Sequence, residues 1–318
     1  MSGGDESADG VPFTHLDQEL FDGADATKRD LIDYFDAVHT GIIACLRDRP
    51  LSVIRIRPGQ PPFMQKNLPK YTPEWVARVA IWADASHREV SYALCNDRRT
   101  LLWFANQRAV EYHVTLFSMT EPMHPDYLVL DLDPPEGASF GVVVQAAQLI
   151  HQVLDEAGMA GGVKTSGAKG LHIFVPLASG TSPEDAAAAT RAIAVRAERI
   201  DPDLATTAFV KEEREGKVFL DSTRAGGATV VAAYSPRIRP GVPVSFPVSW
   251  DDLENVVPAD FTIKNAGGLL DGTDPWAEQM PEPQQLDADL LAEGHTIPVA
   301  RVQAMHEGKR RARARRDS

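Results

Sequence analysis

The stretch DYLVLDLDPPEG, residues 126–137, has the pattern of a buried β-strand that ends in two acidic residues and a turn. Side chains alternate between the faces of a strand, so Asp131 and Asp133 share one face while Leu130 and Leu132 share the other. A rise of about 3.3 Å per residue places the two aspartate α-carbons roughly 6.6 Å apart, within reach of one divalent cation. Two other interpretations fit this spacing: acids that cap a strand end, and the carboxylate pair of an inverting glycosidase.

A third acidic residue occupies a similar position further along the chain. In KVFLDST, residues 217–223, Asp221 also ends a short apolar run. Carboxylate oxygens are hard ligands that prefer Mg²⁺ or Mn²⁺ to softer metals. We therefore expect Asp131, Asp133 and Asp221 to form a divalent-cation site.

The stretch KTSGAKGLHIF, which begins at residue 164, has the composition of a phosphate-binding turn. Its glycines free backbone N–H groups, and its polar side chains add donors and a positive charge. The residues concerned are Ser166, Gly167, Lys169, Gly170 and His172. The stretch matches neither a Walker A nor a G-x-G-x-x-G motif, and a plain tight hairpin is the alternative. Three acids together with a phosphate site favour phosphoryl or nucleotidyl transfer over sugar hydrolysis.

The composition is that of an ordinary globular protein of enzyme size. The chain has 318 residues, of which 43% are hydrophobic and 24% charged, enough to bury a sizeable core. Cys45 and Cys95 stand in no C-x-x-C or Cys/His arrangement, which argues against a structural zinc site or a disulfide framework. We find no export signal and no apolar stretch of about 18 residues, so we expect a cytoplasmic protein without a membrane anchor.

Charge is distributed unevenly along the chain. The net charge is −13, yet residues 309–318, KRRARARRDS, contain six basic residues and one acidic residue. The negative charge of the rest of the chain argues against non-specific binding to nucleic acid, whereas the basic residues at 309–316 permit it. A solvated tail without function and an electrostatic arm for DNA or RNA are both open.

Apolar periodicity predicts a mixed α/β fold. Helices are expected at 27–49, 140–158 and 182–200, with Thr27 and Ser182 as N-caps. Strands are expected at 51–59, 126–133, 169–177, 216–223 and 228–237, and short strand-like or mixed runs at 90–97, 101–107 and 110–117. The proline-rich region 236–283 is expected to be irregular chain that wraps the core.

Several motifs in order resemble one known family. LVLDLDPPEG, KTSGAKGLHIFVPL, KEEREGKVFLD and ATVVAAYSPR are together similar to the archaeo-eukaryotic primase superfamily, and within it to the polymerase domain of bacterial ATP-dependent DNA ligase D, an end-joining repair enzyme. The resemblance implies a primase-polymerase core with central mixed or antiparallel sheets flanked by helices. It covers about residues 13–300, which leaves 1–12 as a disordered acidic tail and 301–318 as the basic tail.

The resemblance implies template-dependent nucleotidyl transfer with two divalent ions, Mn²⁺ or Mg²⁺, and a preference for ribonucleotides. The implied partners are primer-template or gapped DNA, an NTP or dNTP, and a separate DNA ligase or end-binding protein at the nucleoid. With no K-x-D-G motif and no room for a nuclease domain, we expect a stand-alone polymerase that fills short gaps or extends broken ends. A catalytically silent binding relative and a template-independent nucleotidyltransferase are the alternatives.

Site residues follow from the same resemblance. The catalytic and metal-binding residues would be Asp131, Asp133 and Asp221. The nucleotide-binding residues would be His113, Ser166, Lys169, Gly170, His172, Arg214, Lys217, Arg224 and Arg237. Phe63 would stack on a template base, and Lys66 and Lys28 would contact DNA. Taken singly, such residues are more often a structural histidine, a surface charge or a packed ring.

The chain also departs from the family pattern. His15 and Gln18 stand where relatives present Asn and Lys, although Lys28 matches, so we expect a weakened pocket for the 5′-phosphate of a gap. After Asp221 the family often has Gln-Asn, where this chain has Arg224 and Ala225. The family's hydrogen bonds at that point are therefore not transferred to this chain.

Overall fold

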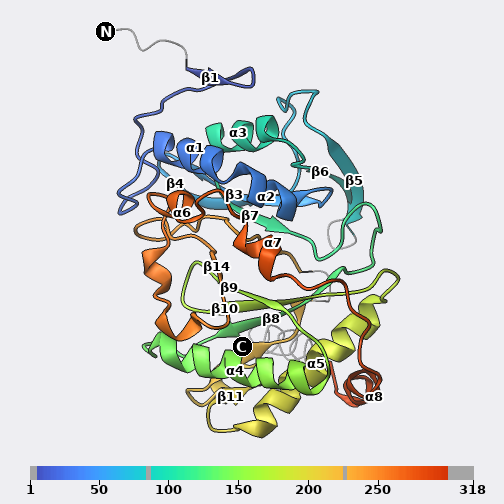
Figure 1. The fold of residues 1–318 in the computed structure, drawn as a ribbon. Coiled ribbons are helices and arrows are strands. Elements are labelled where there is room, and N and C mark those ends of the chain that lie inside the picture. Colours follow the sequence, from blue (N-terminus) through green and yellow to red (C-terminus); the bar gives the residue numbers. More distant parts are fainter. Residues whose placement is uncertain (1–5, 84–86, 225–227, 300–318) are drawn as a thin grey trace, which may run out of the picture. The chain divides into compact units, whose positions relative to one another are not determined.

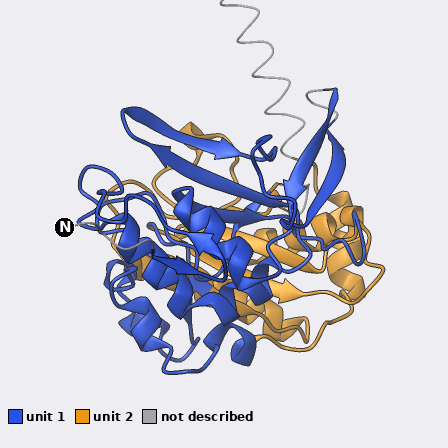
Figure 2. Cartoon of the chain, turned by 90° about the horizontal axis from the view of Figure 1, so that it is seen from above, with its two compact units in different colours: residues 1–123, 164–168, 229–279 blue, residues 124–163, 169–228, 280–318 orange. Residues whose placement is uncertain are grey.

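The computed structural model describes residues 6–83, 87–224 and 228–299, and it forms two compact units (Figures 1 and 2). Unit 1 comprises residues 1–123, 164–168 and 229–279, and unit 2 comprises residues 124–163, 169–228 and 280–318. The predicted basic tail 301–318 lies outside the described residues.

Unit 1 is built on an antiparallel sheet. Its strand order is β13 (Val230–Val231), β7 (Ala109–Val114), β3 (Leu51–Arg57), β6 (Arg88–Ala93) and β5 (Arg78–Ala83), and β4 (Gln60–Gln65) pairs with β3. The helices α1 (Lys28–Ala37), α2 (His39–Leu46) and α3 (Arg98–Asn106) pack together beside this sheet. The core is aromatic where they meet, because Phe35 and Phe104 both pack edge-on against Tyr112.

The first helix begins as predicted and ends early. The Thr27 hydroxyl accepts a hydrogen bond from the Asp30 amide, while the Asp30 carboxylate accepts one from the Thr27 amide, which is a capping box. The predicted helix 27–49 is divided at Val38, whose backbone leaves helical geometry between α1 and α2.

Other segments also differ from expectation, including 228–237, of which only Val230–Val231 form a strand. Of the run 101–107, expected to be strand-like or mixed, residues 101–106 lie in helix α3, whose first turn is capped by Asp97. The apolar residues 101–105 gave no helical period in the sequence. Residues of the predicted acidic tail form the strands β1 (Ser7–Ala8) and β2 (Val11–Pro12), which pair as a hairpin with Val11 buried.

Unit 2 contains the sheet that carries the acidic residues. Its strand order is β11 (Ala205–Thr206), β12 (Val218–Asp221), β8 (Tyr127–Asp133) and β10 (Leu171–Pro176), with β12 and β10 antiparallel to β8. The helices α4 (Phe140–Glu156) and α5 (Pro183–Ile200) pack against the sheet and against each other (Figure 1). Helix α8 (Ala288–Thr296) packs on α5, and the predicted cap Ser182 starts α5. The predicted mixed α/β fold class is confirmed.

The remaining chain is mostly irregular, as predicted for 236–283. It contains only short elements: β14 (Pro247–Val248), the 3₁₀ turns η4 (Leu253–Asn255) and η5 (Pro258–Asp260), and the helices α6 (Ala266–Leu269) and α7 (Pro275–Gln279). Strand β9 (Gly162–Thr165) runs from unit 2 into unit 1.

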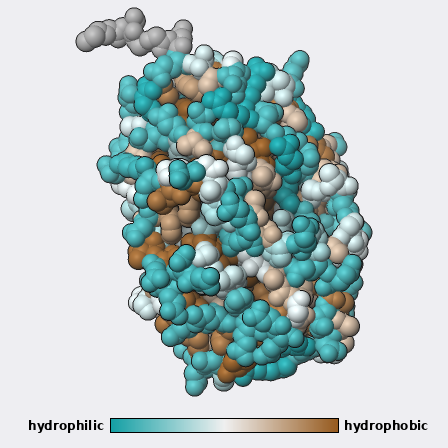
Figure 3. Space-filling view, in the orientation of Figure 1, coloured by the Kyte–Doolittle hydropathy of each residue, from teal (hydrophilic) through white to brown (hydrophobic). Residues whose placement is uncertain are grey.

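The surface view is mostly hydrophilic, with hydrophobic residues in small groups between the polar ones (Figure 3). Scattered apolar residues of this kind are normal on a protein surface. Among the described helices, none has the length and apolar character needed to cross a membrane.

Candidate active site

Strand β8 carries the first two acids, and its neighbours supply the residues beside them. The sheet register places His172 of β10 and Asp221 of β12 directly opposite Asp131. Directly opposite residues project from the same face of a sheet, so these three side chains form one cluster. All three are buried, whereas Asp133, two residues further along β8, is exposed.

Positively charged groups surround the buried acids. One carboxylate oxygen of Asp131, Oδ1, lies 3.2 Å from His172 Nε2, and the other, Oδ2, lies 2.5 Å from Arg224 Nη2. The same Arg224 nitrogen is 3.3 Å from Asp221 Oδ2. Burial alone would raise the pKa of Asp131, but the charges and hydrogen bonds of His172 and Arg224 outweigh it and hold that pKa well below its usual range.

Asp133 behaves in the opposite way. Withdrawal of its carboxyl group from water, followed by repulsion from Asp131 and Asp221, raises the pKa of Asp133 to about 6 even though much of the residue is exposed. The repulsion between Asp133 and the two buried acids favours a cation among them.

The carboxylates of Asp131, Asp133 and Asp221 are suitable ligands for a hard divalent cation, although they are not arranged around one. Within the described part of the chain, no three acidic, histidine or cysteine side chains are grouped as ligands of one ion. The Arg224 guanidinium instead lies between Asp131 and Asp221 and acts as their shared positive charge. Carboxylate oxygens are the ligands of Mg²⁺ and Mn²⁺, so the residues fit such an ion once Arg224 moves.

A basic pocket adjoins the exposed acid. It has a volume of about 400 Å³ and is lined by Asp133, Pro134, Pro135, Glu136, Lys169, Lys211, Arg214, Gly216 and Lys217. Arg214 is held with its guanidinium carbon 3.7 Å from the centre of the Phe219 ring. Four positively charged side chains on one pocket suit a polyphosphate. Lys169, Arg214 and Lys217 were predicted to bind the nucleotide, whereas Lys211, one turn before Arg214, was missed.

Gly170 has a packing role in the structure. A Cβ atom at this position would lie 2.1 Å from the carbonyl oxygen of Leu132. Glycine therefore allows the chain to pass directly beside β8, which sets the distance between the Lys169 region and the acid cluster.

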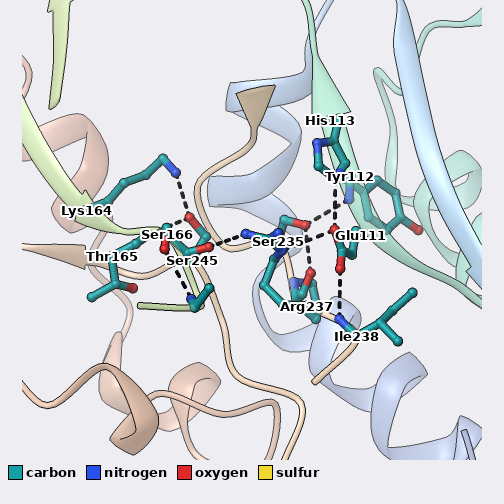
Figure 4. A network of polar contacts seen from close by, with 12 residues as sticks. Glu111, Tyr112, His113, Lys164, Thr165, Ser166, Ser235, Arg237, Ile238 and Ser245 are labelled. Carbon is teal, nitrogen blue, oxygen red and sulfur yellow. Dashed lines mark hydrogen bonds and ion pairs between the residues drawn. The ribbon is translucent and has the colours of Figure 1, made fainter. Parts of the chain in front are cut away.

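A second group of predicted residues gathers in unit 1 around a buried glutamate (Figure 4). Glu111 Oε2 lies 2.9 Å from His113 Nε2 and 3.1 Å from Arg237 Nε. Glu111 Oε1 accepts a hydrogen bond of 2.9 Å from the Ile238 amide, and Arg237 Nη1 donates one of 2.5 Å to the backbone carbonyl of Ser166.

Glu111 was not predicted, and it contacts two residues that were, His113 and Arg237. Burial would raise the pKa of Glu111, but the hydrogen bond from His113, the charge of Arg237 and the Ile238 amide together lower it. The alternation in VEYHV, which puts Glu111 and His113 on one face of β7, was a usable signal. His113, Ser166 and Arg237 belong to unit 1, whereas the acid cluster belongs to unit 2.

Gly167, which follows Ser166 in the turn, occupies a position that only glycine can fill. Gly167 has a φ of +66°, and a Cβ atom there would lie 2.6 Å from Arg237 Cγ and 2.9 Å from the Ser245 amide nitrogen. Both the backbone conformation and the space therefore exclude a side chain.

Of the predicted DNA-binding residues, Phe63 and Lys66 lie at the surface of unit 1. Phe63, on β4, is partly exposed between two arginines, with the guanidinium carbons of Arg57 and Arg55 at 4.5 and 5.8 Å from its ring centre. Lys66 follows β4 and is exposed. An accessible ring flanked by cations is suited to stacking on a base.

Lys28 is buried beside a second cation that sequence reasoning missed. Lys28 donates to the carbonyl oxygen of Thr14, and Arg108 donates to the carbonyls of Glu19 and Leu20. Burial, and secondly the charge of Arg108, lower the pKa of Lys28 to about 8. In the described chain neither cation has a carboxylate partner, and Arg108 Nε and Nη1 make no hydrogen bond.

Arg108 faces a pocket of about 580 Å³ whose lining includes Gln18, Arg57 and Gln60. Buried cations without an anionic partner are costly to a fold, and Arg108, which lines the pocket, could be balanced by an anion bound there. The residue has a φ of +58°, a conformation that a side-chain pattern does not reveal.

Acids at the ends of neighbouring antiparallel strands, next to a basic pocket of polyphosphate size, define a nucleotidyltransferase site. The comparisons with known proteins agree. The family model of the LigD primase-polymerase domain matches residues 27–276, and the chain belongs to that family. This confirms the resemblance found in the sequence and the enzyme class.

The relatives are longer proteins. The bifunctional non-homologous end joining protein LigD of Bacillus subtilis is 35% identical over 258 residues, which cover 80% of this chain and 41% of that protein. The multifunctional LigD of Mycobacterium tuberculosis H37Rv is 32% identical over 265 residues, 79% of this chain and 34% of the relative. The chain thus spans less than half the length of these relatives.

A solved structure matches over nearly its whole length. The polymerase domain of Mycobacterium tuberculosis ligase D in complex with DNA superposes with a TM-score of 0.78 at 29% identity, covering 88% of this chain and 98% of that chain.

Proposed function

We propose that the protein is a template-dependent polymerase that adds nucleotides to a primer end, filling short gaps or extending broken ends during end joining. The observation that carries the proposal is the set of three acids, with Asp221 opposite Asp131 on neighbouring strands and Asp133 on the basic pocket. The match to a polymerase domain with bound DNA and the end-joining relatives support it. Residues 13–300 would form the catalytic domain, acting with a separate ligase or end-binding protein.

In the proposed reaction the primer 3′-oxygen bonds to the α-phosphorus of an NTP or dNTP and pyrophosphate leaves, while the hydroxyl proton passes to solvent. Two Mn²⁺ or Mg²⁺ ions, held by the three aspartates, would supply charge neutralisation for this transfer. Lys169, Lys211, Arg214 and Lys217 would bind the triphosphate, since they line the pocket next to Asp133.

The group around Glu111 in unit 1 contains two further residues predicted to bind the nucleotide. Glu111 fixes His113 and Arg237, because it contacts both and is itself held by the Ile238 amide. We assign Arg237 and His113 to the incoming nucleotide, with Glu111 as the residue that positions them. A ribonucleotide preference belongs to the same proposal.

On the DNA side, we assign Phe63 to a template base and Lys66 to the backbone. Lys28 and Arg108 would bind the 5′-phosphate at the far side of a gap, because both are buried cations without a carboxylate partner in the described chain. Arg108 would then compensate for His15 and Gln18, which replace the family's Asn and Lys.

Extension of a labelled primer across a short gap, with Mn²⁺ and either NTPs or dNTPs, tests the proposal. Asp133→Asn removes a charge at an exposed strand end and should abolish addition, as should the buried substitution Asp131→Ala. Asp203→Ala, at an exposed position of the same unit, is the matched control. Addition that ignores the template sequence would indicate a template-independent transferase, and DNA binding without addition would indicate a silent relative.

A further inference from the structure

The contacts of Arg224 divide the oxygens of the two buried aspartates into two sets. Asp131 Oδ1 faces His172, and Asp221 Oδ1 accepts hydrogen bonds from the amide and hydroxyl of Thr223 at 2.8 and 2.6 Å. The remaining oxygen of each carboxylate, Oδ2, faces Arg224. The protein therefore holds one oxygen of each acid with His172 or Thr223 and leaves the other oxygen to Arg224.

A divalent cation shared by the two aspartates needs the oxygens that Arg224 now holds. The guanidinium and a metal ion are both positive, so they exclude each other from one position by charge as well as by volume. Binding of the ion between these carboxylates must therefore displace Arg224.

The contacts that hold Arg224 against Asp131 and Asp221 are few, so a cation can displace the side chain. Only its Nη2 contacts the acids, and its buried Nε has no hydrogen-bond partner in the described chain. The side chain is 31% exposed, whereas those of Asp131 and Asp221 are 10% and 9% exposed. Moving the guanidinium outward would give Nε access to water, which offsets part of the lost ion pairs.

We propose that Arg224 is a displaceable internal counter-ion, which stabilises the acid cluster without metal and competes with the divalent cation for Asp131 and Asp221. This inference rests on the proposed metal-dependent function. Arg224 then sets the concentration of metal ion at which the site becomes occupied.

The test measures Mn²⁺ binding to the metal-free protein by electron paramagnetic resonance, without nucleotide or DNA. Arg224→Gln keeps hydrogen-bonding capacity and removes the charge, and we expect it to bind Mn²⁺ about tenfold more tightly, the effect of one close but partly exposed charge. Arg199→Gln removes the same charge from an exposed pair with Glu293 in the same unit and should leave the affinity unchanged.

A second readout follows stability. Without metal, Arg224→Gln should melt at a lower temperature than the native protein because the acids lose their counter-ion, and saturating Mn²⁺ should raise its melting temperature by more than it raises the native value. A purely structural arginine would lower the melting temperature without tightening Mn²⁺ binding.

A third measurement needs no variant. In a Mg²⁺ titration of the native protein followed by NMR, the Arg224 Nε–H signal should shift while the Arg199 signal stays in place. If the native protein binds Mn²⁺ and Arg224→Gln binds it no more tightly, the counter-ion proposal is overturned and the metal-dependent function survives. If neither protein binds Mn²⁺ or Mg²⁺, both fail.

Discussion

Removing the buried charge of Glu111 should destabilise the fold by an amount that can be estimated from the contacts of its carboxylate. The substitution Glu111→Gln keeps the shape of the side chain and an acceptor for the Ile238 amide, but it removes the charge that faces Arg237 and His113. Hydrogen bonds to charged groups contribute about 1.5–3 kcal/mol, and breaking a buried ion pair costs about 3–5 kcal/mol. Because Gln retains part of the network, we expect a loss of about 2–3 kcal/mol in unfolding free energy.

This loss should depend on pH in a defined direction. The pKa of Glu111 is lower in the folded protein than in an unfolded chain. Its ionised form therefore stabilises the fold fully above the unfolded pKa, and this contribution is lost as pH falls through the folded value. Glutamine does not titrate, so the difference between the native protein and Glu111→Gln should be largest at pH 7 and shrink below about pH 4.3.

Tryptophan fluorescence suits this measurement because Trp75, Trp82, Trp103, Trp250 and Trp276, the full set of tryptophans in the sequence, belong to unit 1. Urea unfolding followed by this signal at pH 7 and pH 4 would give the two differences. Glu74→Gln, at an exposed position of the same unit, is the control and should change neither. An equal loss at both pH values would refute the assignment of the stabilisation to the Glu111 charge.

Three further predictions concern Arg108, Phe63 and Asp133. Arg108→Met should reduce the preference for gaps with a 5′-phosphate over those with a 5′-hydroxyl about tenfold or more, measured by DNA binding, while unphosphorylated DNA binds as before; an unchanged preference would remove Arg108 from the phosphate site. Phe63→Ala should weaken binding to template DNA by about 1–3 kcal/mol without altering NTP affinity; equal binding would mean that the ring only packs. Since the pKa of Asp133 is about 6 and a metal ligand must be ionised, Mn²⁺ affinity in calorimetry should fall as pH drops below 6, and Asp133→Asn should lose this dependence.

Much of the fold follows from local patterns in the sequence. Thr27 and Ser182 cap the helices that they were predicted to start, and strand β8 ends at the acids as its alternation requires. Helix α3 was missed because its central run LLWFA is entirely apolar, and its polar residues Arg98, Arg99 and Asn106 stand at the ends of the helix.

The site was less predictable than the fold because its contacts join distant segments. Strand periodicity placed Asp131 and Asp133 on one face, but only the register brings His172 and Asp221 opposite Asp131. The pairing of Lys28 with Arg108 depends on a backbone with positive φ, for which a non-glycine residue gives no signal. The motif Ser166–His172 was expected to be one phosphate turn, and the structure divides it between two units.

The net charge of −13 and a polyanionic partner are compatible because charges act over short distances in salt solution. At physiological ionic strength the screening length is about 8 Å, so most surface acids repel a phosphate held in a pocket only weakly. The proposed phosphate ligands are few and placed in pockets, whereas the body that carries them is acidic. The salt dependence of DNA binding grows with the number of phosphates neutralised. Because the proposed function uses only a few pocketed cations, gapped DNA should bind with a shallow salt dependence.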